Sequence, residues 1–285
     1  MSATTPRDWL HRARAHWPNI PVGERRRLLA HALGWRQTEL IARETDALAA
    51  EGLAAGPVFE QLIGRRARGE PIAYLLGEKE FYGRAFAVSP AALIPRPETE
   101  DLVEQALLWL HHRSASTSPL RVLDVGTGSG VIAITLALEH PGLDVWALDI
   151  SVDALGCARR NAIDLQAPVH FLQSDYLTGL ATDECFDLIV ANPPYIAAAD
   201  PHLEQGDLRF EPATALSDGH DGLQAYRCLS MQAPAHLRPG GCILVEHGHT
   251  QQGDILSLFE RAGFTGITGL TDLAGKARMV RATRS

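Results

Sequence analysis

The sequence predicts a doubly wound α/β domain that is preceded by a small helical bundle and a β-hairpin connector. Three observations lead to this fold class. The chain has 285 residues, which exceeds the roughly 100 to 200 residues of one typical domain. Apolar residues recur at helical spacing through the first quarter of the chain. From residue 121 onward, short apolar runs alternate with helical segments, as in a parallel sheet covered by helices.

The first 75 residues predict the helical bundle. Leu28, Leu29, Ala32 and Leu33 illustrate its helical spacing. Three glycines, Gly34, Gly52 and Gly69, are expected to end helices, and Pro57 is expected to begin one.

The next segment predicts a connector and a helix. Aromatic and β-branched residues surround a glycine in residues 81–88, which favours a short hairpin. A helix is expected to begin at Pro97, because acidic residues crowd the following turn, and its buried stripe is Leu102, Val103, Ala106, Leu107 and Leu110. The polar residues 114–119 then predict a loop.

The remainder predicts the sheet and its covering helices. Strands are expected at residues 121–125, 143–149, 169–173, 186–191 and 242–246. Helices are expected at residues 131–139, 152–165 and 223–237.

Composition excludes several function classes. The formal charge of -8 opposes stable binding of nucleic acid, although residues 1–75, with 11 arginines and eight acidic residues, are mildly basic. Because the sequence shows neither a membrane span nor a signal-peptide core, we expect a cytoplasmic protein without membrane contact. The four cysteines lack metal-type spacing and are expected to be buried thiols, and no metal site is predicted.

A glycine-rich turn follows the first predicted strand of the sheet. Residues 124–130 read Asp-Val-Gly-Thr-Gly-Ser-Gly, and their glycines allow a tight turn and close approach to a ligand. Asp149 ends the next predicted strand, 23 residues after Gly126, where a carboxylate can accept both hydroxyl groups of a ribose. Together they indicate a nucleoside-containing ligand.

A second motif, Asn192-Pro193-Pro194-Tyr195, follows the predicted strand 186–191. Proline has no backbone N–H, so this stretch offers carbonyl acceptors with few competing donors, and the Asn192 side chain adds another acceptor. Such an array suits an NH2 group conjugated to a π-system. The Tyr195 ring is expected to lie on the planar substrate group and to orient it.

Both motifs resemble known sequences. The Gly-x-Gly-x-Gly spacing resembles motif I of S-adenosylmethionine-dependent methyltransferases, whose sheet is Rossmann-like. Several further stretches make the chain from about residue 71 to 280 similar to the release factor glutamine methyltransferases (PrmC, also called HemK). They are residues 81–83 (Phe-Tyr-Gly), 94–100 (Ile-Pro-Arg-Pro-Glu-Thr-Glu), 200–203 (Asp-Pro-His-Leu), 206–212 (Gly-Asp-Leu-Arg-Phe-Glu-Pro) and 246–248 (Glu-His-Gly).

The resemblance implies methyl transfer from S-adenosylmethionine to the side-chain nitrogen N5 of the glutamine in the Gly-Gly-Gln motif of class 1 peptide chain release factors, a reaction that serves translation termination. It also implies site residues. The catalytic and substrate-binding residues would be Asn192, Pro193, Pro194 and Tyr195. The cofactor-binding residues would be Gly126, Thr127, Gly128, Ser129, Gly130, Asp149, Tyr176 and Asn192. Tyr176 stands where relatives often have tryptophan.

Three alternatives remain at this point. A related enzyme (PrmB) methylates a glutamine of a large-subunit ribosomal protein and shares the Asn-Pro-Pro-Tyr motif. An adenine-N6 DNA methyltransferase also acts on a planar NH2 group, and a non-catalytic binding module could keep the fold.

The expected organisation is a substrate-docking helical domain at residues 1–75, a hairpin connector at 76–95 and the methyltransferase domain at 96–285. Residues 209–211 are a candidate for closing over the substrate.

Overall fold

The structure is a computed structural model that describes residues 4–113 and 119–285. The chain divides into two compact units between Gly77 and Glu78. The loop predicted at residues 114–119 falls, except for its last residue, outside the described residues. Within the described part of the chain, every helix is too short or too polar to cross a lipid bilayer.

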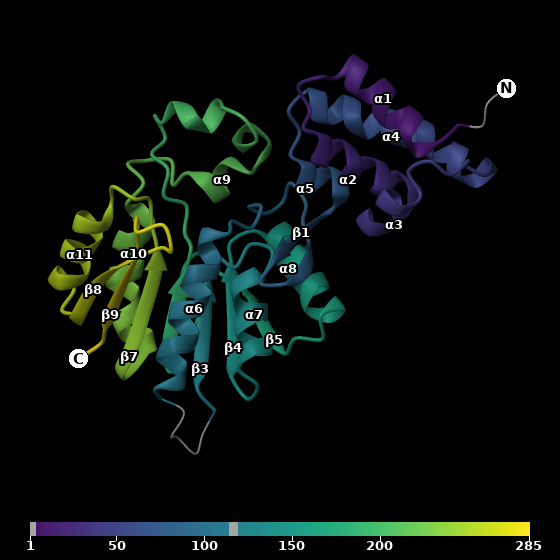
Figure 1. Ribbon diagram of the computed structural model, residues 1–285. Coiled ribbons are helices and arrows are strands. Elements are labelled where there is room, and N and C mark those ends of the chain that lie inside the picture. Colours follow the sequence, from purple (N-terminus) through teal and green to yellow (C-terminus); the bar gives the residue numbers. More distant parts are fainter. Residues whose placement is uncertain (1–3, 114–118) are drawn as a thin grey trace. The chain divides into compact units, whose positions relative to one another are not determined.

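The first unit is helical, as the spacing predicts (Figure 1). Its helices are α1 (Pro6–His16), α2 (Val22–Leu33), α3 (Gln37–Ala42), α4 (Ala50–Ala67) and α5 (Ile72–Leu76). Helix α1 begins with a capping box, in which the Thr5 hydroxyl accepts from the Asp8 amide and the Asp8 carboxylate accepts from the Thr5 amide. The core of this unit includes Trp9, Leu28 and Phe59, all nearly inaccessible to solvent.

Two predicted boundaries in this unit, the helix end at Gly52 and the helix start at Pro57, are wrong. Helix α4 begins at Ala50 and continues through Gly52 and Pro57, so neither residue marks a helix end. Proline removes one helical hydrogen bond, yet the helix persists because its apolar face packs in the core through residues such as Phe59 and Ile63. Gly56 fits closely against Trp9, since an added Cβ would lie 2.9 Å from the indole Cζ2 atom.

Several arginines of the first unit are engaged in ion pairs within it. The pairs are Arg66 with Glu24 at 2.6 Å, Arg65 with Glu70 at 2.5 Å and Arg26 with Glu44 at 3.1 Å. The guanidinium of Arg25, which is buried, donates to the Trp17 carbonyl. These four side chains therefore contribute to the packing of the bundle as well as to its charge.

The second unit begins with a hairpin of strands β1 (Glu78–Phe81) and β2 (Arg84–Ala87). Both turn residues, Tyr82 and Gly83, have positive φ, at 50° and 71°, as a type I′ turn requires. Phe81 and Phe86 pack in the same core as the sheet and its helices, and the Asn161 side chain bonds the Ala87 amide and carbonyl. The hairpin is thus an integral part of the second unit.

A seven-stranded sheet forms the centre of the second unit, in the order β5-β4-β3-β6-β7-β9-β8 (Figure 1). The strands are β3 (Arg121–Val125), β4 (Asp144–Asp149), β5 (Val169–Gln173), β6 (Phe186–Ala191), β7 (Leu237–Glu246), β8 (Thr265–Thr271) and β9 (Ala277–Thr283). The first five are parallel, whereas β9 runs antiparallel to β7 and β8. This confirms the predicted doubly wound fold and adds two strands that the sequence analysis did not identify.

Helices cover both faces of the sheet. They are α6 (Glu98–His111), α7 (Val131–Glu139), α8 (Val152–Asp164), α10 (Gln224–His236) and α11 (Gln252–Arg261). The segment between β6 and α10 contains the short helix α9 (Ala213–Leu216) and 3-10 turns at Pro201–Glu204 and Leu208–Phe210. One core contains the buried stripe of α6, which matches the predicted residues, and α7; the other contains α10 and α11. The strand order reverses between β3 and β6, the point at which open α/β sheets bind ligands.

The cysteines only partly match their prediction. Cys157 and Cys242 are buried, but Cys185 and Cys228 are half-buried. All four are free thiols. Cys185 is the residue before β6, so it lies outside the buried strand. Among residues 4–113 and 119–285, histidine, cysteine and acidic side chains form no group of three that could hold a metal ion.

Candidate active site

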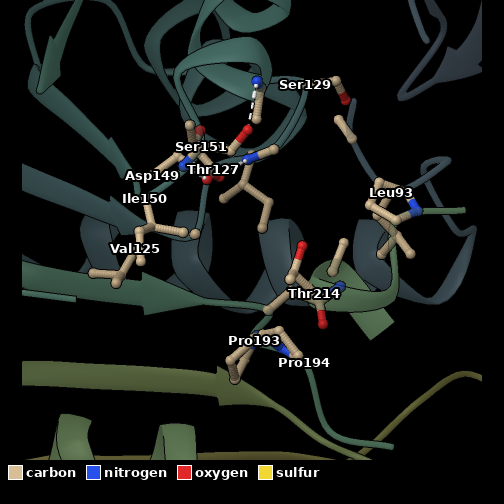
Figure 2. Close-up of a pocket in the computed structure, with 18 of the residues that line it drawn as sticks. Leu93, Val125, Thr127, Ser129, Asp149, Ile150, Ser151, Pro193, Pro194 and Thr214 are labelled. Atoms are coloured by element: carbon tan, nitrogen blue, oxygen red, sulfur yellow. Dashed lines mark hydrogen bonds between the residues drawn. The ribbon is translucent and has the colours of Figure 1, made fainter. Parts of the chain in front are cut away.

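A cavity of about 320 Å³ lies at the carboxyl ends of β3, β4 and β6. Its walls combine the glycine turn, the end of β4, the segment after β6 and two segments from elsewhere in the second unit, residues 91–99 and 212–218. Figure 2 shows Asp149, Ile150 and Ser151 as one group and Pro193 and Pro194 as a separate group across the cavity. The two sequence motifs therefore meet in one cavity.

Positive φ angles and close packing at Gly130 shape the glycine turn. Gly128 has a φ of 57° and Gly130 a φ of 85°. At Gly130, an added Cβ would lie 2.8 Å from Cδ1 of Ile134, so a side chain there would clash. Gly130 supports the turn from behind, whereas Gly126, Thr127, Gly128 and Ser129 line the cavity.

Asp124, at the end of β3, holds this turn. Its Oδ2 atom accepts a hydrogen bond of 2.6 Å from the Thr127 hydroxyl and one of 3.2 Å from the Ala133 amide. The side chain is completely buried, and burial raises the pKa of Asp124 to about 7, although these two hydrogen bonds oppose the shift. Asp124 is a structural residue that the sequence analysis quoted only as part of the motif.

Asp149 lies at the end of β4 on the cavity wall. Its two carboxylate oxygens accept from the Gly128 amide at 2.8 Å and the Ser151 amide at 2.9 Å. Burial raises the pKa of Asp149 above its usual value against these hydrogen bonds. A carboxylate has more lone pairs than these two donors use, so Asp149 can also accept from a ligand.

Tyr176 follows β5 and lines the same cavity. Its φ of 47° is unusual for a non-glycine residue, and the Ser174 hydroxyl stabilises this turn by donating 2.7 Å to the Tyr176 carbonyl. The ring packs partly against the core beneath it, and burial raises the pKa of Tyr176 to about 12. Tyr176 therefore presents a neutral aromatic surface.

Asn192 combines one satisfied and one unsatisfied polar atom. Its Nδ2 atom donates 3.0 Å to the Thr99 hydroxyl, which belongs to the first turn of α6. Its Oδ1 atom is buried and has no hydrogen-bond partner among the described residues. Leaving a buried acceptor unpaired costs about 1 to 3 kcal/mol, so such an atom at a cavity wall indicates a missing donor.

The next three residues divide into two groups. Pro193 and Pro194 line the cavity, but Tyr195 is not among the lining residues. The Tyr195 side chain packs against the core instead, and its carbonyl accepts 2.9 Å from Nε2 of Gln251. Burial raises the pKa of Tyr195 to about 12. The structure thus brings together every predicted site residue at the cavity wall except Gly130 and Tyr195, which lie behind it.

An ion pair that no sequence pattern indicated, between Arg96 and the buried Glu211, lies beside the cavity. The Glu211 carboxylate, whose side chain is fully buried, accepts a hydrogen bond of 2.9 Å from the Ile94 amide and a charge-assisted bond from the Arg96 guanidinium. It joins two segments distant in sequence, residues 94–96 and 208–212, that both border the cavity. Glu211 therefore fixes the segment that was expected to close over a substrate.

Comparison with known proteins identifies relatives of both units. A family model described as "Methyltransferase small domain" matches residues 105–214, and one described as "PrmC N-terminal domain" matches residues 8–77. Among solved structures, a methyltransferase from Pyrococcus furiosus has a TM-score of 0.54 at 18% identity, covering 78% of this chain and 97% of its own. The 16S rRNA N2 G1207 methyltransferase of T. thermophilus, in complex with AdoMet and guanosine, has a TM-score of 0.52 at 19% identity, with coverages of 73% and 50%. These two show the methyltransferase fold.

Curated relatives are more similar. The release factor glutamine methyltransferase of Burkholderia pseudomallei is 48% identical over 257 residues, which is 88% of each chain. Its counterpart from Bordetella pertussis is 47% identical over 92% of this chain and 94% of its own, and that from Escherichia coli is 42% identical over 88% of each. At this identity and coverage, the chain belongs to the release factor glutamine methyltransferase family.

Proposed function

We propose that this protein transfers a methyl group from S-adenosylmethionine to the N5 nitrogen of the glutamine in the Gly-Gly-Gln motif of class 1 peptide chain release factors. The observation that carries the proposal is that Oδ1 of Asn192 has no hydrogen-bond partner among the described residues. Asn192 lines the same cavity as the glycine turn. The names of the relatives support the same substrate. The reaction would serve translation termination.

The cavity fits S-adenosylmethionine, which supplies an electrophilic methyl group when bound. The turn at residues 126–129 gives backbone atoms close access to a ligand, and Asp149 offers carboxylate oxygens for ribose hydroxyls. Tyr176 offers a half-buried ring against which adenine can pack. We propose these residues together with Asn192, which also lines the cavity, as the cofactor-binding set, with Gly130 supporting the turn from behind.

The Asn192 motif supplies what a glutamine nitrogen needs. A carboxamide nitrogen is a poor nucleophile because its lone pair is delocalised into the carbonyl. Hydrogen-bond acceptors that hold its N–H groups favour the state in which positive charge develops on nitrogen. Oδ1 of Asn192 is such an acceptor, and Pro193 and Pro194 bring no N–H that would compete with the substrate.

Tyr195 has a different part in this proposal from the stacking role that the sequence suggested. Its ring lies outside the cavity wall, and its carbonyl is held by Gln251. The same Gln251 Nε2 atom donates 3.0 Å to the Gly222 carbonyl. Tyr195 therefore anchors the peptide that follows the two prolines, so that the acceptor corner keeps its shape.

We also propose that the helical unit, residues 1–75, docks the release factor, with the hairpin at 76–95 and the methyltransferase domain at 96–285 following it. Support comes from its mildly basic composition and from Arg12 and Arg14, which are exposed on α1. Replacing both by glutamate should raise the KM for the release factor and leave kcat unchanged. Because Arg65 and Arg66 form internal ion pairs, they are poorer choices for this test.

Separate incubations with three kinds of methyl acceptor test which substrate is methylated. The protein is incubated with methyl-labelled S-adenosylmethionine and, separately, with a class 1 release factor, ribosomal subunits and duplex DNA. Label in the release factor alone is the expected result. Label found only in a ribosomal protein or only in DNA would replace the proposal by one of the alternatives; for DNA, the net charge of -8 is unfavourable.

A further inference from the structure

A buried glutamate lies directly beside the acceptor corner. Glu246 is the last residue of β7, and β7 pairs with β6 so that Val245 faces Ala191, the residue before Asn192. Glu246 is 2% exposed, and its Oε2 atom has no hydrogen-bond partner within residues 4–113 and 119–285. Burying a carboxylate that is incompletely paired is unfavourable, and packing at a strand end would be better served by an apolar residue. The position thus requires another explanation.

The neighbours of Glu246 connect it to Asn192. Side-chain hydrogen bonds from Thr99 and Asn192 stabilise its charged form, and Arg278 on β9 adds a favourable positive charge. Thr99 also accepts from Nδ2 of Asn192 at 3.0 Å. Threonine has a single hydroxyl hydrogen, which remains free to point at the carboxylate while the oxygen accepts from the asparagine. Thr99 of α6, Glu246 of β7 and Asn192, the residue after β6, therefore form one polar cluster around the hydrogen bond between Asn192 and Thr99.

The cluster determines which end of the Asn192 amide is available. The oxygen and nitrogen ends of an asparagine amide have nearly the same shape, so only hydrogen-bond partners fix its orientation. An ionised carboxylate can only accept, and so it attracts the Nδ2 end and repels the Oδ1 end. The orientation in the structure agrees, since Nδ2 bonds Thr99 and Oδ1 has no partner in the described part of the chain.

We propose that Glu246, acting with Thr99, is a positioning residue that holds the amino end of the Asn192 amide and so keeps its Oδ1 for the N–H of the substrate. This inference rests on the proposed methylation of glutamine. It gives Glu246 no contact with the methyl group or with the substrate. Its effect is on Asn192 alone, and through Asn192 on the turnover of bound substrate.

The protonation state of Glu246 should then affect turnover. Burial raises the pKa of Glu246 to about 7, against the hydrogen bonds and the charge of Arg278. Below that pH the neutral acid can donate a hydrogen bond, and it then competes for Oδ1 of Asn192. The other groups that face Glu246 are Glu98, Arg278, Tyr195 and Tyr226. Burial raises the pKa of Tyr195 to about 12 and that of Tyr226 further, so neither tyrosine ionises near pH 7.

The test compares the wild type with Glu246→Gln, whose amide keeps the size of the side chain but can donate as well as accept. We expect kcat to fall at least tenfold, with the KM for the release factor and the affinity for S-adenosylmethionine within about twofold of the wild type. The exposed Glu260→Gln is the matched control and should leave every parameter unchanged.

The pH profile separates positioning from a structural role. Wild-type kcat should be about tenfold lower at pH 6 than on its plateau above pH 8, as expected for one group with a pKa of about 7. The Glu246→Gln variant should lack this decrease. A variant that has the wild-type rate and the wild-type pH profile would overturn the inference.

Two further measurements test the inference even if the Glu246→Gln variant does not fold. Thr99→Val keeps the shape but removes the hydroxyl that bonds Asn192, and it should lower kcat at least fivefold. Full activity of Thr99→Val, or a wild-type kcat that does not change through pH 7, would each contradict the role of the cluster. If the wild type fails to methylate a release factor at all, then the proposed function is what has failed, because the inference concerns only how that reaction is supported.

Discussion

The side chain of Asn192 donates a hydrogen bond of 3.0 Å to the hydroxyl of Thr99. This bond joins the acceptor motif after β6 to the first turn of α6, and it gives the stretch at residues 94–100 a physical connection to the site. By sequence alone, that stretch was a well-formed helix start whose significance came from its resemblance to relatives. The structure shows that it borders the cavity through Pro95, Arg96 and Thr99.

Replacing Gly130 by alanine should weaken both folding and cofactor binding. The new Cβ would meet Ile134 at 2.8 Å and the Ala158 Cβ at 3.1 Å, at a φ of 85° that alanine adopts poorly. We expect a loss of about 1 to 3 kcal/mol in the free energy of unfolding and a weaker affinity for S-adenosylmethionine. Urea unfolding and calorimetry measure the two effects.

Gly253→Ala is the matched control for this change. Gly253 lies in α11, and an added Cβ would have no atom within 4 Å. Alanine is favoured over glycine in a helix, so this variant should be neutral or slightly more stable. Equal effects of the two substitutions would contradict the steric account of the turn.

Asp124 should make folding stability depend on pH. Because burial raises its pKa in the folded state from 3.8 to about 7, the unfolded state releases this proton at lower pH than the folded state does. The stabilisation is complete below about pH 3.8 and is lost as the pH rises through 7. Asp124→Asn should therefore remove part of the decrease in unfolding free energy between pH 5 and pH 8.

Urea denaturation of both proteins at several pH values measures this difference. The exposed Asp153→Asn is the control, and its profile should coincide with that of the wild type. If Asp124→Asn and the wild type lose stability in parallel as the pH rises, then Asp124 is ionised in the folded protein and the burial argument is wrong.

Glu211 should be needed to hold the cavity wall. Its carboxylate bonds the Ile94 amide and the Arg96 guanidinium while fully buried, so Glu211→Ala leaves a buried donor unpaired and the two wall segments unconnected. We expect a cost of about 3 kcal/mol or more, and faster amide hydrogen exchange in residues 208–217.

The ion pair of Asp221 and Arg227 offers a comparison, because both side chains are largely exposed. Asp221→Ala should destabilise the protein far less than Glu211→Ala, because water screens the charges of a surface ion pair. A comparable cost for the two substitutions would mean that Glu211 contributes no more than a surface charge.

The parts of the fold that could be predicted from sequence are those in which burial is complete. Strand β6 is buried at every residue and β3 at all but one, so their apolar runs are unambiguous. Strand β8, in contrast, is half-exposed and contains Gly266 and Gly269, so its residues show neither an apolar run nor clear alternation. It forms only because β9 supplies a partner.

The site could be predicted where the residues that line the cavity belong to one short sequence motif. Asp149, Pro193 and the glycine turn reach the cavity because they follow strands whose carboxyl ends meet at one sheet edge. The contacts of Glu246 and Glu211 could not be predicted, because their partners, Thr99 and Arg96, are more than 100 residues away in sequence. The position of Tyr195 behind the wall likewise depends on its contact with Gln251, which no local pattern indicates.

The central claim is that an acceptor on Asn192 holds the carboxamide of a release factor glutamine while it is methylated. Its most direct test is the rate at which a methyl group appears on the side-chain nitrogen of the Gly-Gly-Gln glutamine, measured by peptide mass spectrometry for the wild type and for Asn192→Ala. The account predicts methylation of that nitrogen by the wild type and, at saturating S-adenosylmethionine, a rate about 100-fold lower for the variant, which corresponds to about 3 kcal/mol. Methylation at another residue, or an Asn192→Ala variant as fast as the wild type, would contradict it.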